Sequence, residues 1–322
     1  MSLKIIFAEA DLARVTVATG PDPMWEVLLS LHAVQDDTAG GPFARWRDRI
    51  DRSAVPGELR RLAPARGYSP DFLTPDHGPA DLDDGIDAIR RTPRQRLHRE
   101  LRRLAGPRTL PGGLRALATG DNASLRDLTK TLCGYHRGAL RPYWPEIEHD
   151  VREDRAQRAR VLLAGGVAEL LATLHPMLTW HDGTLELHGE HVSGELRLAG
   201  RGLRLIPSFF CHGAPTVLAD PELRPVLVYP IKHDPDWLSR AGRDRDERAA
   251  LAALLGPTRA QVLDAAATGC TTTELSRRVG ISAAAASYHT SIMRDAGLIT
   301  TRREGSSVRH TLTALGRELL AQ

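Results

Sequence analysis

The pattern of apolar and polar positions is clearest near the end of the chain. In residues 273–279, Leu275 and Val279 are four apart and therefore share one face of a helix. Gly280 follows, and a glycine at this point lets the backbone take a positive φ and end the helix. Ser282 can cap a second helix, because a serine oxygen accepts a hydrogen bond from an early backbone N–H. The pattern predicts two short helices joined by a tight turn.

A strand pattern follows the second helix. Four alanines favour that helix, and Ala286 and Met293 belong to its apolar stripe. Leu298–Thr300 and Val308–Leu312 then read as two strands, with a turn at residues 304–307 between them. Two helices and a hairpin in this order predict a winged helix-turn-helix, which places one helix in the DNA major groove and the hairpin beside it.

The first 235 residues or so show a different mixture. Helical spacing dominates as far as residue 174, and apolar or alternating runs rich in β-type residues follow Pro176. We interpret those later runs as a four-stranded antiparallel meander. The predicted helices are Pro23–Val34, Phe43–Ile50, Ile89–Leu104, Asp121–Leu140 and Pro145–Leu174, and the predicted strands of the meander are Thr184–His188, Glu195–Leu198, Leu203–Phe210 and Val226–Ile231.

These patterns together predict an α+β protein of two domains. A length of 322 residues suits two domains. The charged stretch Ala241–Arg248 marks the junction between them. We expect residues 1–238 to form an N-terminal domain of helices and antiparallel sheet that serves sensing or dimerisation. Residues 243–322 are then the winged helix-turn-helix DNA-binding domain.

Several ordered matches in the last quarter of the chain point to a known family. They are the run LAALLGPTRAQVLDAA at Leu251–Ala266, Ser287, His289, the AGLI of Ala296–Ile299 and the RREG of Arg302–Gly305. With these matches, the segment from Leu254 onward resembles the bacterial ArsR-type transcription repressors. The whole layout resembles the long, actinobacterial-type members with an extra N-terminal domain. The resemblance implies a cytoplasmic, homodimeric DNA-binding regulator that acts as a repressor on a palindromic operator.

The DNA contacts are expected from the second helix and the hairpin. That helix has no Arg, Lys, Asn or Gln before Arg294, so the bidentate contacts to guanine and adenine are missing. Hydroxyls, an imidazole and alanine methyls are offered instead, and we expect modest base discrimination. Arginines of the hairpin would bind phosphate. The predicted DNA-binding residues are Ser282, Ala283, Ala285, Ser287, Tyr288 and His289 on the helix, and Arg302, Arg303 and Arg309 on the wing.

Metal control is not expected. Metal sensors of the family carry paired cysteines on the helix before the recognition helix, but that helix here reads TTTELSRR, and only Cys270 precedes it. One thiol does not close a tetrahedral site. The last helix offers only Glu318. We therefore expect no metal and no cofactor, and a non-metal small-molecule effector in the N-terminal region. Trp25, Trp180 and the apolar strands there could line its pocket or form the core.

Charge and composition add little on their own. The chain has 43 basic and 40 acidic residues, a formal net charge of +3 and a pI of about 8.9. Three scattered cysteines give no disulfide framework and suit a reducing compartment. No run of eighteen apolar residues and no signal peptide is present, so we expect a cytoplasmic protein without membrane contact.

No catalytic motif is found, and we expect no enzyme activity and no catalytic residue. The chain lacks a Walker loop, G-x-G-x-x-G, G-x-S-x-G and HExxH. Two alternatives stay open: an enzyme-like N-terminal domain fused to the DNA-binding module, or a ligand-independent architectural DNA binder. The arginine-rich helix Arg90–Arg108 is either a solvated face or a second contact to DNA phosphate. A loose histidine group reads as surface and loop residues rather than a metal site: His175, His181, His188, His191 and His212, beside Cys211.

Overall fold

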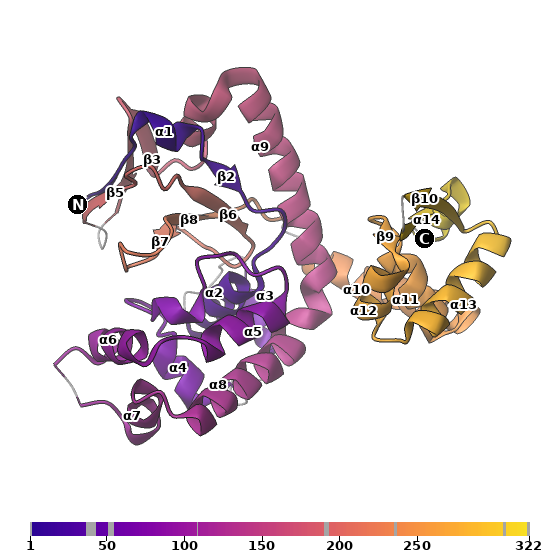
Figure 1. The fold of residues 1–322 in the computed structure, drawn as a ribbon, viewed down its shortest axis with the longest axis horizontal. Coiled ribbons are helices and arrows are strands. Elements are labelled where there is room, and N and C mark those ends of the chain that lie inside the picture. Colours follow the sequence, from indigo (N-terminus) through magenta and orange to yellow (C-terminus); the bar gives the residue numbers. More distant parts are fainter. Residues whose placement is uncertain are drawn as a thin grey trace. The chain divides into compact units, whose positions relative to one another are not determined.

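The structure is a computed structural model that divides into two compact units, Met1–Leu238 and Ser239–Gln322. It describes residues 2–36, 43–50, 55–107, 109–189, 193–234, 237–304 and 307–320, with the backbone alone for 241–249 and 304. Figure 1 shows helices and sheets mixed in the first unit, and a small bundle of helices with a hairpin in the second. The predicted fold class, mixed helix and sheet followed by a winged helix-turn-helix, is confirmed.

Two mixed four-stranded sheets form the β part of the N-terminal unit (Figure 1). In the first, β1 pairs antiparallel with β4 and parallel with β5, so the start of the chain lies inside the sheet. In the second, β6 lies between β2 and β8 and is parallel to both. The first sheet contains β3 (Leu178–His181), β4 (Thr184–His188), β1 (Ser2–Ile6) and β5 (Gly194–Arg197), and the second β2 (Thr16–Val17), β6 (Arg204–Ser208), β8 (Val226–Pro230) and β7 (Thr216–Val217).

The predicted antiparallel meander is therefore wrong. Its four strands exist, but they divide between two sheets, and β6 and β8 are parallel. Alternation identifies a strand, but it does not identify the partner, and β1 and β2 arrive from the far end of the chain. Strands β6 and β8 are buried at four of their five positions. Such continuous apolar runs are typical of parallel strands that are covered on both faces.

Helices cover these sheets and account for most of residues 9–172. Asp22 caps the buried helix α2, accepting hydrogen bonds from the N–H groups of Met24 at 3.2 Å and Trp25 at 3.3 Å. The long helix α9 is interrupted at Gly166, which has φ of 73° and ψ of −170°. The helices are α1 (Glu9–Leu12), α2 (Pro23–Gln35), α3 (Ala44–Arg49), α4 (Gly57–Leu62), α5 (Leu82–Arg90), α6 (Arg94–Ala105), α7 (Gly112–Ala118), α8 (Asn122–Tyr135) and α9 (Trp144–Ala172), with a 3₁₀ turn η2 at Asp71–Leu73, a π turn at His136–Leu140 and a 3₁₀ turn at Arg141–Tyr143.

Buried carboxylates fasten helices to the second sheet. The carboxylate of Glu26, on α2, accepts hydrogen bonds from the N–H groups of Phe209 at 2.8 Å and Phe210 at 3.0 Å. On α9, Asp154 accepts a hydrogen bond of 2.7 Å from the hydroxyl of Tyr229 on β8. Each contact satisfies a polar group that would otherwise be buried alone.

The C-terminal unit has the order of elements that the sequence predicts. Helix α10 (Trp237–Leu255) leads into it, and its three-stranded antiparallel sheet has the order β10-β11-β9. Its buried core includes Val262, Leu263, Leu275, Ala286 and Met293. The remaining elements are α11 (Pro257–Ala265), β9 (Cys270–Thr271), α12 (Thr272–Val279), α13 (Ala283–Asp295), β10 (Ile299–Glu304), β11 (Ser307–Leu312) and α14 (Ala314–Leu320).

Candidate nucleic-acid interface

Local hydrogen bonds fix both ends of α12. Thr271 and Glu274 form a capping box: the Thr271 N–H donates to the Glu274 carboxylate at 2.8 Å, and the Glu274 N–H donates to the Thr271 hydroxyl at 3.3 Å. These bonds lower the pKa of Glu274. Gly280 ends the helix in the left-handed region, with φ of 73°, and the Ser276 hydroxyl donates to the Ile281 carbonyl at 2.6 Å. The turn into α13 is therefore held on both sides.

Helix α13 packs one face into the unit and leaves the other free. Ser282 caps it by accepting a hydrogen bond of 3.1 Å from the Ala285 N–H, and Ala286, Thr290 and Met293 are buried. Tyr288 is 62% exposed, and its ring meets that of His289 edge to face at a centroid distance of 5.4 Å. Of the predicted helix residues, Ser282, Ala283, Ser287 and Tyr288 are exposed, whereas Ala285 and His289 are half-buried.

Ala284 was not among the predicted DNA-binding residues, but it is exposed one turn before Tyr288. Helical spacing places residues four apart on the same face, so this signal was present in the sequence. The free face of α13 therefore carries methyl groups, hydroxyls and one phenol. This chemistry can contact thymine methyl groups and make single hydrogen bonds to base edges.

The wing separates the three predicted arginines onto two faces. In the β10–β11 register, Arg302 lies directly opposite Arg309, whereas Arg303 lies opposite Val308. Because side chains alternate along a strand, Arg302 and Arg309 share one face of the hairpin and Arg303 points to the other. The predicted turn residues Gly305 and Ser306 lie outside the described residues. Like charges directly opposite each other are unfavourable, and an anion between them relieves the repulsion.

His310 was not predicted as part of the site. It is 4% exposed, its Nε2 lies 2.9 Å from the hydroxyl of Thr272, and its Nδ1 lies 3.1 Å from that of Thr301. Burial, followed by the charge of Arg294, lowers the pKa of its imidazole, so the ring is neutral at pH 7. It therefore joins both wing strands to the start of α12. Its alternation with Val308 and Leu312 was the sequence signal for an inward position.

Two arginines of the C-terminal unit, Arg278 and Arg294, have hydrogen-bond partners within the unit. The guanidinium of Arg278 donates to the carbonyl of Ala265 at 3.2 Å and to the hydroxyl of Thr268 at 3.0 Å, so it braces the unit. Arg294 donates to the hydroxyl of Ser291 at 2.8 Å.

The histidine group of the N-terminal unit does not converge. His188 lies 3.1 Å from the hydroxyl of Thr179, and His175 accepts a hydrogen bond of 3.2 Å from the Met177 N–H. His191 lies outside the described residues. Across the described part of the chain, no three His, Cys, Asp or Glu side chains come together as metal ligands would.

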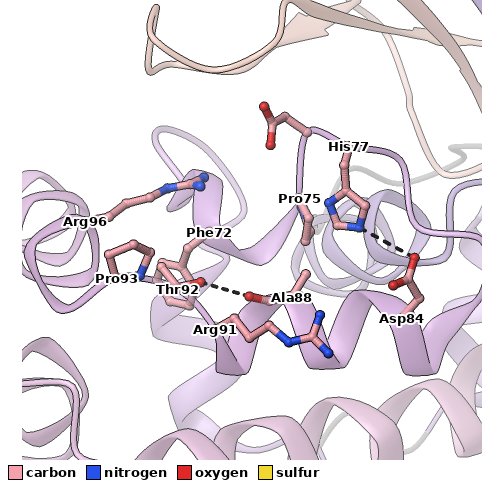
Figure 2. Close-up of a pocket in the computed structure, with 10 residues that line it drawn as sticks. Phe72, Pro75, His77, Asp84, Ala88, Arg91, Thr92, Pro93 and Arg96 are labelled. Carbon is pink, nitrogen blue, oxygen red and sulfur yellow. Dashed lines mark hydrogen bonds and ion pairs between the residues drawn. The ribbon is translucent and has the colours of Figure 1, made fainter.

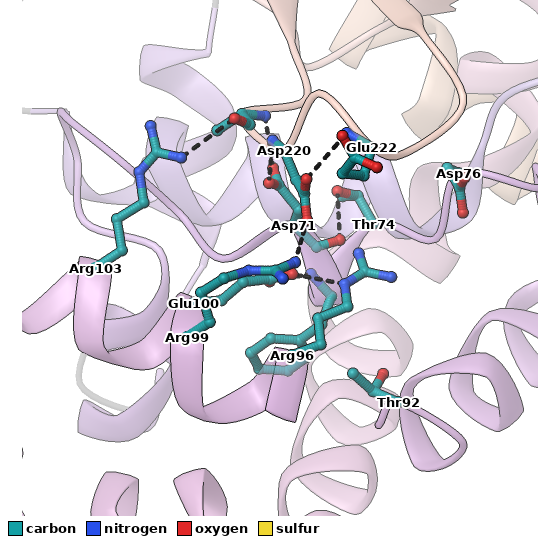
Figure 3. A network of polar contacts seen from close by, with 12 residues as sticks. Asp71, Thr74, Asp76, Thr92, Arg96, Arg99, Glu100, Arg103, Asp220 and Glu222 are labelled. Atoms are coloured by element: carbon teal, nitrogen blue, oxygen red, sulfur yellow. Dashed lines mark hydrogen bonds and ion pairs between the residues drawn. The ribbon is translucent and has the colours of Figure 1, made fainter. Parts of the chain in front are cut away.

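The arginine-rich helix α6 is only partly a solvated face. Figure 3 shows Arg99 reaching Asp220, and Arg103 donating to the carbonyl of Ala219 at 3.2 Å. The guanidinium of Arg103 also lies 4.5 Å from the ring centre of Tyr68. These side chains hold the loop before β8. Trp25 and the strands β6 and β8, which could line a pocket or form the core, are buried in the N-terminal unit.

Comparison with known proteins supports the winged helix-turn-helix. A family described as a helix-turn-helix domain matches residues 254–302, and a family of unknown function (DUF5937) matches residues 118–235. No curated protein matches the chain. A solved structure, reduced HlyU from Vibrio cholerae N16961, is similar at 24% identity over 27% of this chain and 90% of that chain, with a TM-score of 0.21. The chain thus carries a DNA-binding domain of the kind found in transcription regulators. In the described residues, no helix is both long and apolar enough to cross a membrane.

Proposed function

We propose that this protein is a homodimeric transcription repressor that reads a palindromic operator. The observation that carries the proposal is the free face of α13, with exposed Ser287 and Tyr288, on a helix whose other face is fixed in the core. Two-fold symmetric winged helices read half-sites about one helical turn apart. The residues proposed to contact DNA are Ser282, Ala283, Ala285, Ser287, Tyr288 and His289 on α13, and Arg302, Arg303 and Arg309 on the wing.

Side-chain chemistry assigns different contacts to α13 and to the wing. The hydroxyls and methyl groups of α13 would read base edges, each with a single contact. Arg302 and Arg309, opposite each other on one face of the wing, would bind phosphate. Because the base contacts are few, specificity would depend on the spacing of the two half-sites and on DNA shape.

The dimer is proposed through apolar side chains at the two ends of the unit. Leu254 on α10 is 71% exposed and Leu315 on α14 is 54% exposed. Four other leucines on α10 and α14 are less available. Leu251 is buried in the core of the unit, and Leu255, Leu319 and Leu320 are packed against that core. We therefore assign the contact to Leu254 and Leu315.

One experiment tests specificity and dimerisation together. The full-length protein selects DNA from a random library, and the enriched sequences are bound again at several salt concentrations. The proposal expects an inverted repeat, and sedimentation at micromolar concentration should show a dimer that Leu254→Asp weakens. Thr273→Asp, at an exposed position of α12, adds the same single negative charge and should leave the dimer intact. Enrichment of no sequence would instead favour a ligand-independent architectural DNA binder.

Control by a small organic molecule completes the proposal. The effector would bind in the N-terminal unit and favour one state of the DNA-binding unit, because a ligand shifts an equilibrium only through different affinities for its two states. No catalytic role is assigned to either unit, and no cofactor is required. We place the protein in the cytoplasm, where its DNA would be.

A further inference from the structure

A pocket of about 390 Å³ lies in the N-terminal unit between α5, the start of α6 and the loop after η2 (Figure 2). Its apolar wall includes the ring of Phe72 and the side chains of Pro75, Ala88 and Pro93. This volume is within the usual range for small-molecule sites, which combine an apolar wall with a few placed polar groups.

One end of the pocket is cationic. Arg96 uses its Nε to donate a hydrogen bond of 2.6 Å to Glu100, but its Nη2 is buried and has no hydrogen-bond partner among the described residues. A buried guanidinium N–H without an acceptor is unfavourable, and an anionic ligand supplies that acceptor. Arg91 adds a second guanidinium to the lining, held loosely 3.4 Å from Asp87 with 75% of its side chain exposed.

The opposite end is acidic. Figure 2 shows His77 and Asp84 together on the far side of Pro75 and Ala88, with 3.5 Å between the imidazole and the carboxylate. Asp76 also lines the pocket and accepts a hydrogen bond of 2.8 Å from the Arg224 N–H. A second negative charge on a ligand would meet these carboxylates. The pocket therefore favours one anionic group at one end only.

We propose that this pocket binds a small organic monocarboxylate with a flat apolar body. The carboxylate would accept a hydrogen bond from Arg96, because guanidinium groups bind carboxylates with strong, directed bonds. The body would lie against Phe72 and Pro75. A dicarboxylate or a neutral amide of the same size would bind more weakly.

The pocket is joined to the second sheet by a short polar chain (Figure 3). Glu100, the partner of Arg96, accepts a hydrogen bond of 2.7 Å from the Phe72 N–H. The neighbouring Asp71 accepts hydrogen bonds from the N–H groups of Ala219 at 3.0 Å and Asp220 at 2.9 Å. A ligand that binds Arg96 would change the contact of Arg96 with Glu100. Through residues 71–72, this change would reach the loop before β8. That this makes the pocket the effector site rests on the proposed function.

Binding is measured on the full-length protein without DNA, by fluorine NMR with para-fluorobenzoate as the probe. The probe signal should broaden saturably, and benzoate should displace the probe. Benzamide should compete about tenfold less well than benzoate, the size of effect that loss of a charge-assisted hydrogen bond produces. Terephthalate should also compete less well, because its second carboxylate would meet the acidic end of the pocket. Arg96→Met should weaken binding about tenfold, and Arg102→Met, an exposed arginine on the same helix, should not.

Absence of saturable binding, or equal affinity of the Arg96→Met and Arg102→Met proteins, would overturn the site. Equal competition by terephthalate and benzoate would overturn the single-anion assignment. If Arg96→Met does not fold, Arg96→Lys takes its place, since it keeps a positive charge beside Glu100 but removes Nη2. Because DNA is absent, a negative result leaves the DNA-binding proposal intact. If benzoate binds but the affinity for DNA does not change, the pocket is a binding site without the effector role.

Discussion

The imidazole of His310 and the hydroxyl of Thr272 lie 2.9 Å apart and connect the wing to the first helix of the helix-turn-helix. The other ring nitrogen reaches Thr301 on β10, so one buried side chain contacts three elements. A wing held in this way keeps a fixed position relative to α12, and through the capped turn relative to α13. The arrangement of helix and wing is therefore built into the unit before DNA binds.

We expect His310→Leu to loosen the wing. The variant leaves the hydroxyls of Thr272 and Thr301 without their partner, which should cost about 1–3 kcal/mol of stability. Hydrogen exchange followed by mass spectrometry should show faster exchange in β10 and β11. Thr300→Val is the control, because it removes the exposed contact of 2.9 Å to Thr311 and leaves His310 untouched. Equal exchange in the two variants would contradict this role for His310.

Removal of a wing arginine should weaken all DNA binding alike. Arg302→Ala is expected to lower affinity for operator and random DNA by the same factor and to reduce the slope of log affinity against log salt by about one. Arg278→Ala is the control, because its guanidinium is engaged within the unit. The measurement is fluorescence anisotropy over a salt series, and an unchanged slope in Arg302→Ala would argue against a phosphate contact.

Tyr288 should instead affect sequence preference. Its exposed phenol is the largest group on the free face of α13, so Tyr288→Ala should reduce the ratio of operator to random affinity by about tenfold, about 1.4 kcal/mol, which is in the range for loss of one base contact. The salt slope should stay the same. Thr273→Ala, an exposed change on α12, provides the comparison. If the ratio is the same in all three proteins, α13 is not the recognition helix.

The C-terminal unit was predictable because its signals are local. Gly280, the cap at Ser282 and the alternation after Gly297 each act within a few residues of their own position. Even the separation of Arg303 from Arg302 follows from the two-residue period of a strand. The sequence prediction grouped these arginines only because it counted charges without assigning faces.

The N-terminal unit was less predictable because its decisive contacts are distant along the chain. The pairing of β1 with β5 joins residues nearly two hundred positions apart, and no local pattern encodes a partner. The ion pair between Arg99 and Asp220 also joins distant parts of the chain, and through it a basic helix holds the loop before β8. The pocket lies partly on residues 72–84, a stretch rich in proline and aspartate that has no apolar period from which a pocket could be predicted.

Glu26 should make the N-terminal unit less stable as pH rises toward neutrality. Burial raises the pKa of Glu26 from 4.5 to about 7, so the folded state holds a proton that the unfolded chain has already released. The contribution of Glu26 to the unfolding free energy should then decrease by about 3 kcal/mol between about pH 5 and 8. His32 and His136, whose pKa values burial lowers to about 4, contribute in the opposite direction, so the effect is read as the difference between wild type and Glu26→Gln. All five tryptophans lie within residues 1–238, so their fluorescence in urea reports this unit.

Glu26→Gln should remove this contribution, because the amide does not titrate. Asp22 and Asp71, whose pKa values burial raises to about 6, keep their own decrease in both proteins, so their contributions cancel in the difference. Glu195→Gln, at an exposed carboxylate of β5, is the control and should keep the wild-type pH profile. A difference in unfolding free energy between wild type and Glu26→Gln that does not change with pH would show that Glu26 is not responsible.

Metals are not expected to control DNA binding, and Cys270 gives the reason. Its side chain is fully buried, and burial raises the pKa of its thiol, which disfavours the thiolate that zinc and arsenite require. The residue opposite it in the sheet is His310, but both ring nitrogens there already contact hydroxyls. Coordination at this position would have to break the link between wing and α12. We expect operator affinity, measured by anisotropy, to be the same with zinc, arsenite or a chelator, and the same in Cys270→Ser. A large metal-induced loss that disappears in Cys270→Ser would make this protein a metal sensor.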